Sequence, residues 1–199
     1  MGLLTKGHVI TCSDRNRRGG VKAIYLGEVA KIDGFTIGGT GTHNITSIVG
    51  FAAGQTVDLV YKFEFDRETA YFTANATREN GSTIVDSEVG FTIPKITEET
   101  NLRLEELKDS CGLFAIVETF ADDGTNTYKF VIGFDNIFQK DAFLEFASGE
   151  QNSGTALQDP NETVVKLTGR LAEYPREYVP SGNGLVVEGT ASNNAFSLT

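Results

Sequence analysis

The chain has 199 residues, a formal net charge of −10 and a sequence pI of about 4.7. A surface this acidic repels phosphate groups, which excludes tight binding of the free protein to DNA or to anionic lipid. Hydrophobic residues make up 40% of the chain, enough for a core, and 22 glycines against 4 prolines indicate many turns. Because its 14 Phe and 6 Tyr favour pleated surfaces, we expect a mainly β fold.

The charge is unevenly distributed along the chain. Residues 1–20 hold four basic side chains against one acidic side chain, a net of +3, which leaves −13 for the remainder. We interpret residues 13–20 as a cationic loop, because the segment is polar and ends in two glycines. It either contacts acidic residues of a neighbouring copy or is a mobile loop that aids solubility. The candidate inter-subunit contact residues are Arg15, Arg17 and Arg18.

The first part of the chain predicts strands separated by glycine-containing turns. We expect strands at 7–12, 21–32 and 35–37, with Asp33-Gly34 as the turn between the last two. The glycine-rich segment 38–43 predicts a hairpin loop. It is not a phosphate-binding loop, because the required lysine and the following helix are missing.

The clearest periodicity in the chain lies between residues 56 and 78. Residues 57–65 alternate apolar and polar side chains, and residues 69–78 return after a turn at 66–68. This pattern predicts a long β-hairpin with one polar face. Asn80-Gly81 predicts a tight turn into a further strand over 82–93.

One α-helix is expected, over about residues 97–110. Thr97 is a candidate N-cap, two glutamates occupy the first turn, where the helix dipole favours anions, and Gly112 follows as a stop signal. We expect this helix to cover one side of a β-barrel or β-sandwich. Its predicted apolar face consists of Leu104, Leu107 and Cys111.

The C-terminal part predicts more strands and an extended end. The predicted strands are 113–119 and 128–134 around a turn at 122–124, a short one at 143–146 and a last one at 163–171, with a loop over 148–156. Residues 180–199 are rich in Gly, Ser and Asn and are typical of an arm or a disordered tail. We therefore expect a single domain over residues 1–179.

The two cysteines and the N-terminus bear on the cellular compartment. Cys12 and Cys111 are flanked by apolar residues, so we expect two buried thiols and not a disulfide scaffold. The N-terminus lacks the pattern of a signal peptide, and no stretch approaches 18 continuous apolar residues. Cytoplasmic synthesis and residence, with no membrane partner, is the default expectation.

No motif for catalysis or metal binding stands out. The only histidines are His8 and His43, and zinc-ligand spacings and a nucleophile elbow are absent from the sequence. Glu64 and Asp66 have a spacing that suits a glycosidase pair, but a solvated hairpin tip explains them more simply. We predict no catalytic, cofactor-binding or metal-binding residues, no cofactor and no enzymatic activity.

Residues 93–179 nevertheless resemble a known family in three places. The first is the passage from Ile93-Pro94 through the helix to the acid-terminated strand 113–118, and the second is the strand Tyr128–Gly133. The third is the Ser-Gly-Thr-Ala-x-x-Asp loop over 153–159, with the strand 164–169 and a proline-containing exit over 173–178. Together they resemble the C-terminal half of tail tube proteins of tailed bacteriophages, a form common in phages of Bacteroidetes hosts. The family's glycine after the Asp loop is not found in this sequence.

The resemblance implies a tube-forming β-barrel or β-sandwich with a flanking helix. Six subunits would form a ring, and rings would stack into a channel through which DNA passes, as in the related type VI secretion tubes. The implied partners are further copies of the chain and other tail proteins, and the implied location is the virion tail, assembled in the host cytoplasm. Other readings are a tail terminator, a head–tail adaptor, a capsid decoration protein, or a carbohydrate-binding or hydrolytic β-sandwich.

Overall fold

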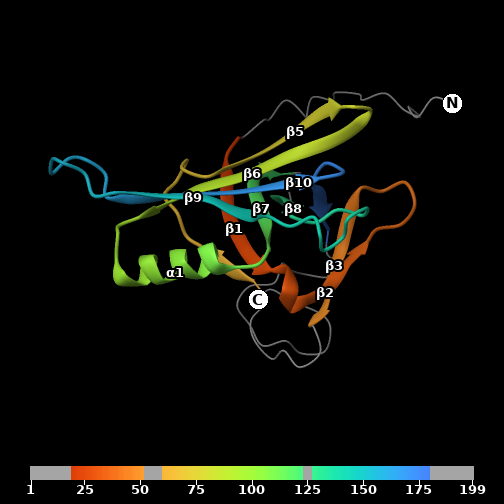
Figure 1. Cartoon of the computed structure of the whole chain (residues 1–199), viewed down its shortest axis with the longest axis horizontal. Coiled ribbons are helices and arrows are strands. Elements are labelled where there is room, and N and C mark those ends of the chain that lie inside the picture. Colours follow the sequence, from red (N-terminus) through yellow and green to blue (C-terminus); the bar gives the residue numbers. More distant parts are fainter. Residues whose placement is uncertain (1–18, 52–59, 123–126, 180–199) are drawn as a thin grey trace.

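The computed structural model describes residues 19–51, 60–122 and 127–179, which form two β-sheets and one α-helix (Figure 1). The elements are β1 (Val21–Glu28), the 3-10 turn η2 (Val29–Lys31), β2 (Ile32–Ile37), β3 (Asn44–Phe51), β4 (Tyr61–Phe63), β5 (Tyr71–Glu79), β6 (Ser82–Pro94), α1 (Glu98–Asp109), β7 (Leu113–Asp122), β8 (Thr127–Ile132), β9 (Glu145–Asn152), β10 (Glu162–Leu171) and β11 (Arg176–Tyr178). The prediction of a mainly β fold with one helix is confirmed.

The larger sheet has seven strands in the order β2-β3-β11-β8-β7-β1-β4. All neighbouring strands are antiparallel except β11 and β3, which are parallel. The sheet is strongly curved, as a contact between two strands that are not neighbours in it shows. Phe35 on the edge strand β2 packs edge-to-face against Phe114 on β7, with ring centroids 5.2 Å apart. The concave side of the sheet encloses one of the two hydrophobic clusters, which includes the fully buried Ile32, Ile45 and Ile116.

The smaller sheet has four antiparallel strands in the order β5-β6-β10-β9. β5 and β6 are joined by the predicted tight turn at Asn80-Gly81. Both turn residues have positive φ, 49° and 86°, as a two-residue hairpin turn requires. β6 and β10 then pair over ten consecutive positions, from Val85–Leu171 to Pro94–Glu162, and form the centre of this sheet.

The second hydrophobic cluster lies between the two sheets. It joins inward residues of both: Ile24, Leu26, Ala115 and Val117 from the seven-stranded sheet, and Val85, Val89, Phe91, Val165 and Leu167 from the four-stranded sheet. Most of these side chains are less than 3% exposed. Burying them stabilises the fold by the hydrophobic effect and holds the sheets face to face. The described strands therefore form two packed sheets, as in the β-sandwich alternative, and not a closed barrel.

The helix begins as predicted. The Thr97 hydroxyl accepts a hydrogen bond from the Thr100 amide at 3.1 Å, which satisfies an otherwise unpaired donor at the helix start. Leu107 is buried, and Leu104 packs against the cluster between the sheets. The prediction for Cys111 is wrong: its thiol is exposed, because the helix ends at Asp109 and Cys111 lies beyond its apolar face. Cys12 lies outside the described residues.

The predicted hairpin over 57–65 and 69–78 is also wrong. Residues 57–59 lie outside the described residues, and β4, which follows them, pairs with β1 in the seven-stranded sheet. β5 pairs with β6 in the other sheet. A turn does form between them, where the Thr69 amide donates to the Asp66 carbonyl at 3.2 Å, but it carries the chain from one sheet to the other. Alternation identifies the two faces of a strand but not its neighbour.

The structure also differs from the sequence-based prediction at one turn and one loop. The chain reverses at η2, where Val29 is buried, and β2 continues through the predicted turn Asp33-Gly34. The predicted loop at 148–156 begins later than expected, because β9 extends to Asn152. Pairing with β10 extends β9 through polar residues that have little strand preference of their own.

Candidate assembly surface

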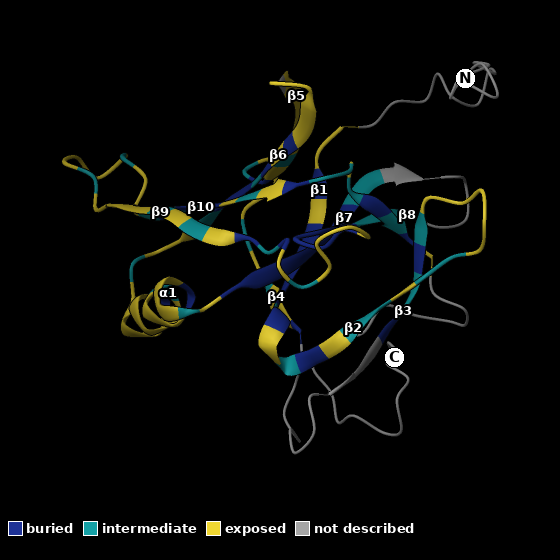
Figure 2. Cartoon of the chain, turned by 45° about the vertical axis from the view of Figure 1, so that its right-hand side comes forward, coloured by how far each residue is buried: buried dark blue, intermediate teal, exposed yellow. Residues whose placement is uncertain are grey.

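The four-stranded sheet has one face on the core and one face in solvent (Figure 2). On β6, Val85 and Val89 point inward, and Asp86 and Glu88, between them, point away from the core. We call this solvent side the outer face. It is defined by Thr73, Asn75, Asp86, Glu88, Glu145, Thr168 and Arg170, which line a shallow depression of about 480 Å³.

The strand register places these side chains in rows across the sheet. Glu88 lies between Thr73 on β5 and Thr168 on β10, and Thr168 is followed by Glu145 on β9. Asp86 lies opposite Arg170, with Oδ1 of Asp86 3.3 Å from Nε of Arg170. Because that pair is well exposed, its contribution to stability is small.

The outer face is acidic. The depression is bordered by four carboxylates, those of Asp86, Glu88, Asp141 and Glu145, against the single guanidinium of Arg170, a formal net of −3. Such a face repels polyanions and attracts cations at low ionic strength. No cluster of three or more metal-ligand side chains occurs among the described residues.

Tyr71 shapes one end of this face. Its ring lies over Gly90 on β6, where an added Cβ atom would stand 2.5 Å from the ring carbons. Its hydroxyl donates a hydrogen bond to the Glu88 carboxylate, which raises the pKa of Tyr71 to about 12. The aromatic ring of Tyr71, on the edge strand β5, thereby covers the backbone that Gly90 leaves bare on β6.

Both edges of this sheet are open in the described part of the chain. β5 pairs only with β6, and β9 pairs only with β10. α1 reaches the β9 edge, where Nε2 of Gln151 donates to Oδ1 of Asn101 at 2.5 Å, but it supplies no strand. Long open edges present unpaired N–H and C=O groups and favour pairing with another strand.

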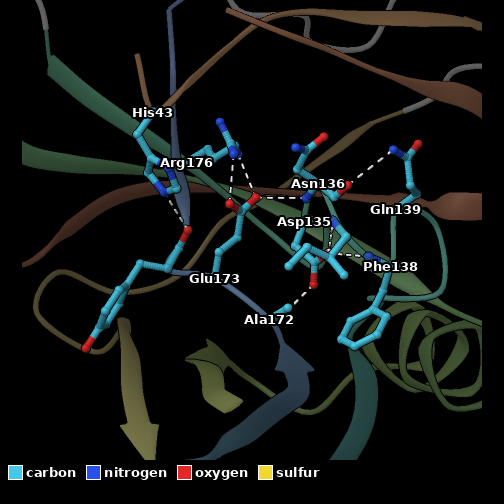
Figure 3. A network of polar contacts seen from close by, with 10 residues as sticks. His43, Asp135, Asn136, Phe138, Gln139, Ala172, Glu173 and Arg176 are labelled. Atoms are coloured by element: carbon cyan, nitrogen blue, oxygen red, sulfur yellow. Dashed lines mark hydrogen bonds and ion pairs between the residues drawn. The ribbon is translucent and has the colours of Figure 1, made fainter. Parts of the chain in front are cut away.

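A buried polar network fixes the loop that borders the outer face (Figure 3). Asp135 is fully buried, and its carboxylate accepts hydrogen bonds from the amides of Ile137, Phe138 and Ala172 at 2.8, 2.5 and 2.8 Å. It therefore ties the loop after β8 to the segment after β10. Ile137 and Phe138 are held at the surface of this loop, 66% and 52% exposed.

Glu173 and Arg176 extend the same network (Figure 3). Arg176 donates from Nε and Nη2 to the two carboxylate oxygens of Glu173, both at 2.7 Å, and Glu173 also accepts from the Asn136 amide. Burial works against the charge on Glu173, but these hydrogen bonds outweigh it and lower the pKa of the carboxyl. A ring nitrogen of His43 lies 2.9 Å from the Tyr174 carbonyl oxygen, so this histidine is engaged in a backbone contact.

The strand-terminating acid of the resemblance, Glu118, is also a structural residue. It is only 7% exposed, and it accepts from Lys22 Nζ at 2.7 Å and from the Thr127 hydroxyl at 2.5 Å. Burial raises the pKa of this carboxyl, and the hydrogen bonds from Lys22 and Thr127 reverse that effect, so the net pKa is lowered. Glu118 therefore joins β1, β7 and β8.

The structure brings together few of the residues that the sequence singled out. Arg15, Arg17 and Arg18, the strand predicted at 7–12, and the segment 180–199 all lie outside the described residues. Glu64 and Asp66 are both exposed, and the Glu64 carboxylate lies 3.4 Å from Lys62 Nζ. Sequence analysis missed the outer face and the Asp135 network. The only sequence signal for the outer face was the alternation of acids and β-branched residues over the strand that became β6.

No family model, no curated protein and no solved structure matches this chain. The one described helix is too short and too polar to cross a bilayer.

Proposed function

We propose that this protein is a structural subunit of a phage-type tail tube, which self-assembles into stacked rings around a channel for DNA. The resemblance of residues 93–179 to tail tube proteins supports this proposal. The observation that carries it is the four-stranded sheet, with two open edges and an exposed acidic face. That combination suits repeated edge-to-edge pairing between identical copies.

The open edges provide the geometry for a ring. β5 offers nine residues at one edge and β9 offers eight at the other. Pairing β5 of one copy with β9 of the next continues the sheet without a break. It is a heterologous contact, which closes into a ring when the rotation per copy divides a full turn.

The acidic outer face provides the surface for the channel. When the sheets of neighbouring copies join at their edges, their outer faces line a common wall with a formal charge of −3 per copy from the residues of the depression. Such a wall repels the phosphates of DNA, so DNA passes through without binding. The protein would then act in the virion tail, with itself and other tail proteins as partners.

Two adjacent proline substitutions on β5 test the edge pairing. Ala76 and Thr77 are both exposed and lie opposite Val85 and Ile84 on β6. Successive N–H groups of a strand point alternately to its two sides. One of the two substitutions, Ala76→Pro or Thr77→Pro, therefore removes a hydrogen bond to β6. The other removes only an N–H group at the open edge of the sheet, and we call it the free-edge variant. We expect the free-edge variant to keep the thermal stability of the parent but to form neither rings nor tubes in negative-stain electron micrographs.

The same images separate the alternatives. Stacked rings from the parent chain support the tube. Closed rings that never stack support a terminator or adaptor, and a strictly monomeric chain at millimolar concentration contradicts self-assembly altogether. Tubes of normal length from both proline variants contradict pairing through β5.

A further inference from the structure

A groove lies between α1 and the β1–β4 edge of the seven-stranded sheet, apart from the outer face. It has a volume of about 660 Å³. Leu26, Phe63 and Leu107 give it an apolar lining that continues into the cluster between the sheets. The groove is therefore large enough, and apolar enough along one side, to take up part of an extended segment of chain.

One wall of the groove is an open strand edge. β4 pairs with β1 through Ile24, Tyr25 and Leu26, and its other edge has no strand partner among the described residues. Tyr61 on this strand is 40% exposed. An extended peptide that enters the groove can form main-chain hydrogen bonds with β4, as in β-strand addition.

The opposite wall is acidic. α1 carries five carboxylates and two basic side chains, a formal net of −3, and of these Glu99, Glu106 and Arg103 line the groove. Both basic residues are engaged within the helix, Arg103 with Glu106 at 2.8 Å and Lys108 with Glu105. Lys31 and Lys62 also line the groove, and each is paired with a glutamate near it in the sequence. Glu99 lines the groove and has no lysine or arginine within 4 Å in the described part of the chain. A cationic, strand-forming segment is the complement of these two walls.

The N-terminal segment has that composition. Residues 1–18 carry four basic side chains and one acid, and they combine the β-branched run Val9-Ile10-Thr11 with the arginines at 15, 17 and 18. Eighteen extended residues span up to about 60 Å, far enough to reach an adjacent molecule. The segment joins the fold at Gly19, before the start of β1, whereas the groove lies at the far end of β1 beside Leu26.

We propose that residues 1–18 of one copy bind this groove of a neighbouring copy, with the run 9–11 along β4 and the arginines against the carboxylates of α1. The proposal rests on the self-assembly proposed above and identifies a second contact between copies. Arginine suits this wall, because its planar guanidinium can bind one carboxylate through two hydrogen bonds.

Cysteine pairing between two labelled populations tests the proposal. In a Cys12→Ser, Cys111→Ser background, one population carries Arg15→Cys and the other carries Glu99→Cys with a different affinity tag. We expect mixed, assembled and oxidised samples to give a disulfide-linked heterodimer on a non-reducing gel. A population with Asp86→Cys, an exposed acid on the outer face, is the matched control and should give several-fold less product.

The outcomes separate this contact from the proposed function. Tubes that form without cross-linking above the Asp86→Cys control overturn the contact and leave the function standing. An intrachain disulfide in a dilute monomer carrying both Arg15→Cys and Glu99→Cys overturns the assignment to a neighbour. If the parent forms no rings or tubes, the proposed function fails. A peptide-binding measurement then tests on its own whether residues 1–18 bind the groove.

A peptide of residues 1–18 gives that independent readout. We expect a fluorescent peptide to bind the full chain and to bind the Glu98→Gln, Glu99→Gln variant roughly three- to tenfold more weakly, as expected for the loss of two surface charge pairs. The Asp86→Asn variant should bind like the parent. Equal affinity for all three chains contradicts the proposal.

Discussion

The two sheets use similar strands but bury them differently. The seven-stranded sheet is covered on both faces, by the four-stranded sheet on one side and by its own curvature on the other, so Phe114, Ile116 and Ile132 are all fully buried. The four-stranded sheet buries only its inner face and exposes acids on the other. We therefore expect the first sheet to contribute more to stability and the second to present the larger free sheet face. The following predictions test that division, from the largest expected effect on stability to the smallest.

The largest effect is expected in the core of the seven-stranded sheet. Phe114→Ala removes a fully buried ring that packs edge-to-face against Phe35. The lost burial and the cavity should reduce the free energy of unfolding by about 3–5 kcal/mol. Urea denaturation measures this, with Thr168→Ala on the outer face as control, for which we expect a change below about 0.5 kcal/mol. Similar losses for both variants would contradict the division between the sheets.

The next effect is expected in the Asp135 network. Asp135→Ala leaves three amides without their acceptor in a fully buried site, and we expect it to cost about 3 kcal/mol. Asp135→Asn keeps the shape and one carbonyl oxygen, so it should cost less. Thermal denaturation of both variants provides the comparison. Equal losses would show that the negative charge matters and not the number of acceptors.

Acid should weaken the fold through two hydrogen-bonded carboxylates, those of Glu118 and Glu173. The pKa of Glu118 and that of Glu173 are lowered from the ordinary 4.5, so these groups bind protons more weakly in the folded chain than in the unfolded chain. Their contribution to stability is fully present above about pH 4.5 and is lost as the pH falls through the folded-state pKa values. Urea midpoints between pH 7 and pH 3 should show a shallower decline in Glu173→Gln than in the parent. An unchanged slope would contradict this assignment.

The smallest effect on stability is expected on the outer face. Asp86→Lys with Glu145→Lys changes the charge of the depression from −3 to +1, because each substitution adds two units. Both residues are exposed, so unfolding should change by less than about 1 kcal/mol. Assembled protein should instead acquire salt-sensitive binding of double-stranded DNA in a sedimentation assay. Asp33→Lys with Asp66→Lys, two exposed acids outside the outer face, is the control, and equal DNA binding by that variant would contradict a channel wall at the outer face.

Much of the local structure was predictable, because its causes lie within a few residues. Asn80-Gly81 favours a hairpin turn through positive φ, and Thr97 caps the helix through a bond to an amide three residues away. The strands at 82–93 and 163–171 follow from β-branched periodicity, and the structure confirms them as β6 and β10. The extent of β9 was missed, because its polar sequence becomes a strand only beside β10.

By itself, the sequence determined the helix, several of the longer strands, the acidic balance and the two faces of β6. It did not predict β3 or β11. Only the tertiary structure decided that β4 and β5 belong to different sheets, since a strand's neighbour depends on packing between distant segments. It also decided that Asp135 meets Ala172, 37 residues away, and that the acids of β6, of β9 and of the loop before β9 share one exposed face. Local preferences act over a few residues, whereas burial and strand pairing join residues that are far apart in the chain, and these long-range contacts create both the outer face and the groove.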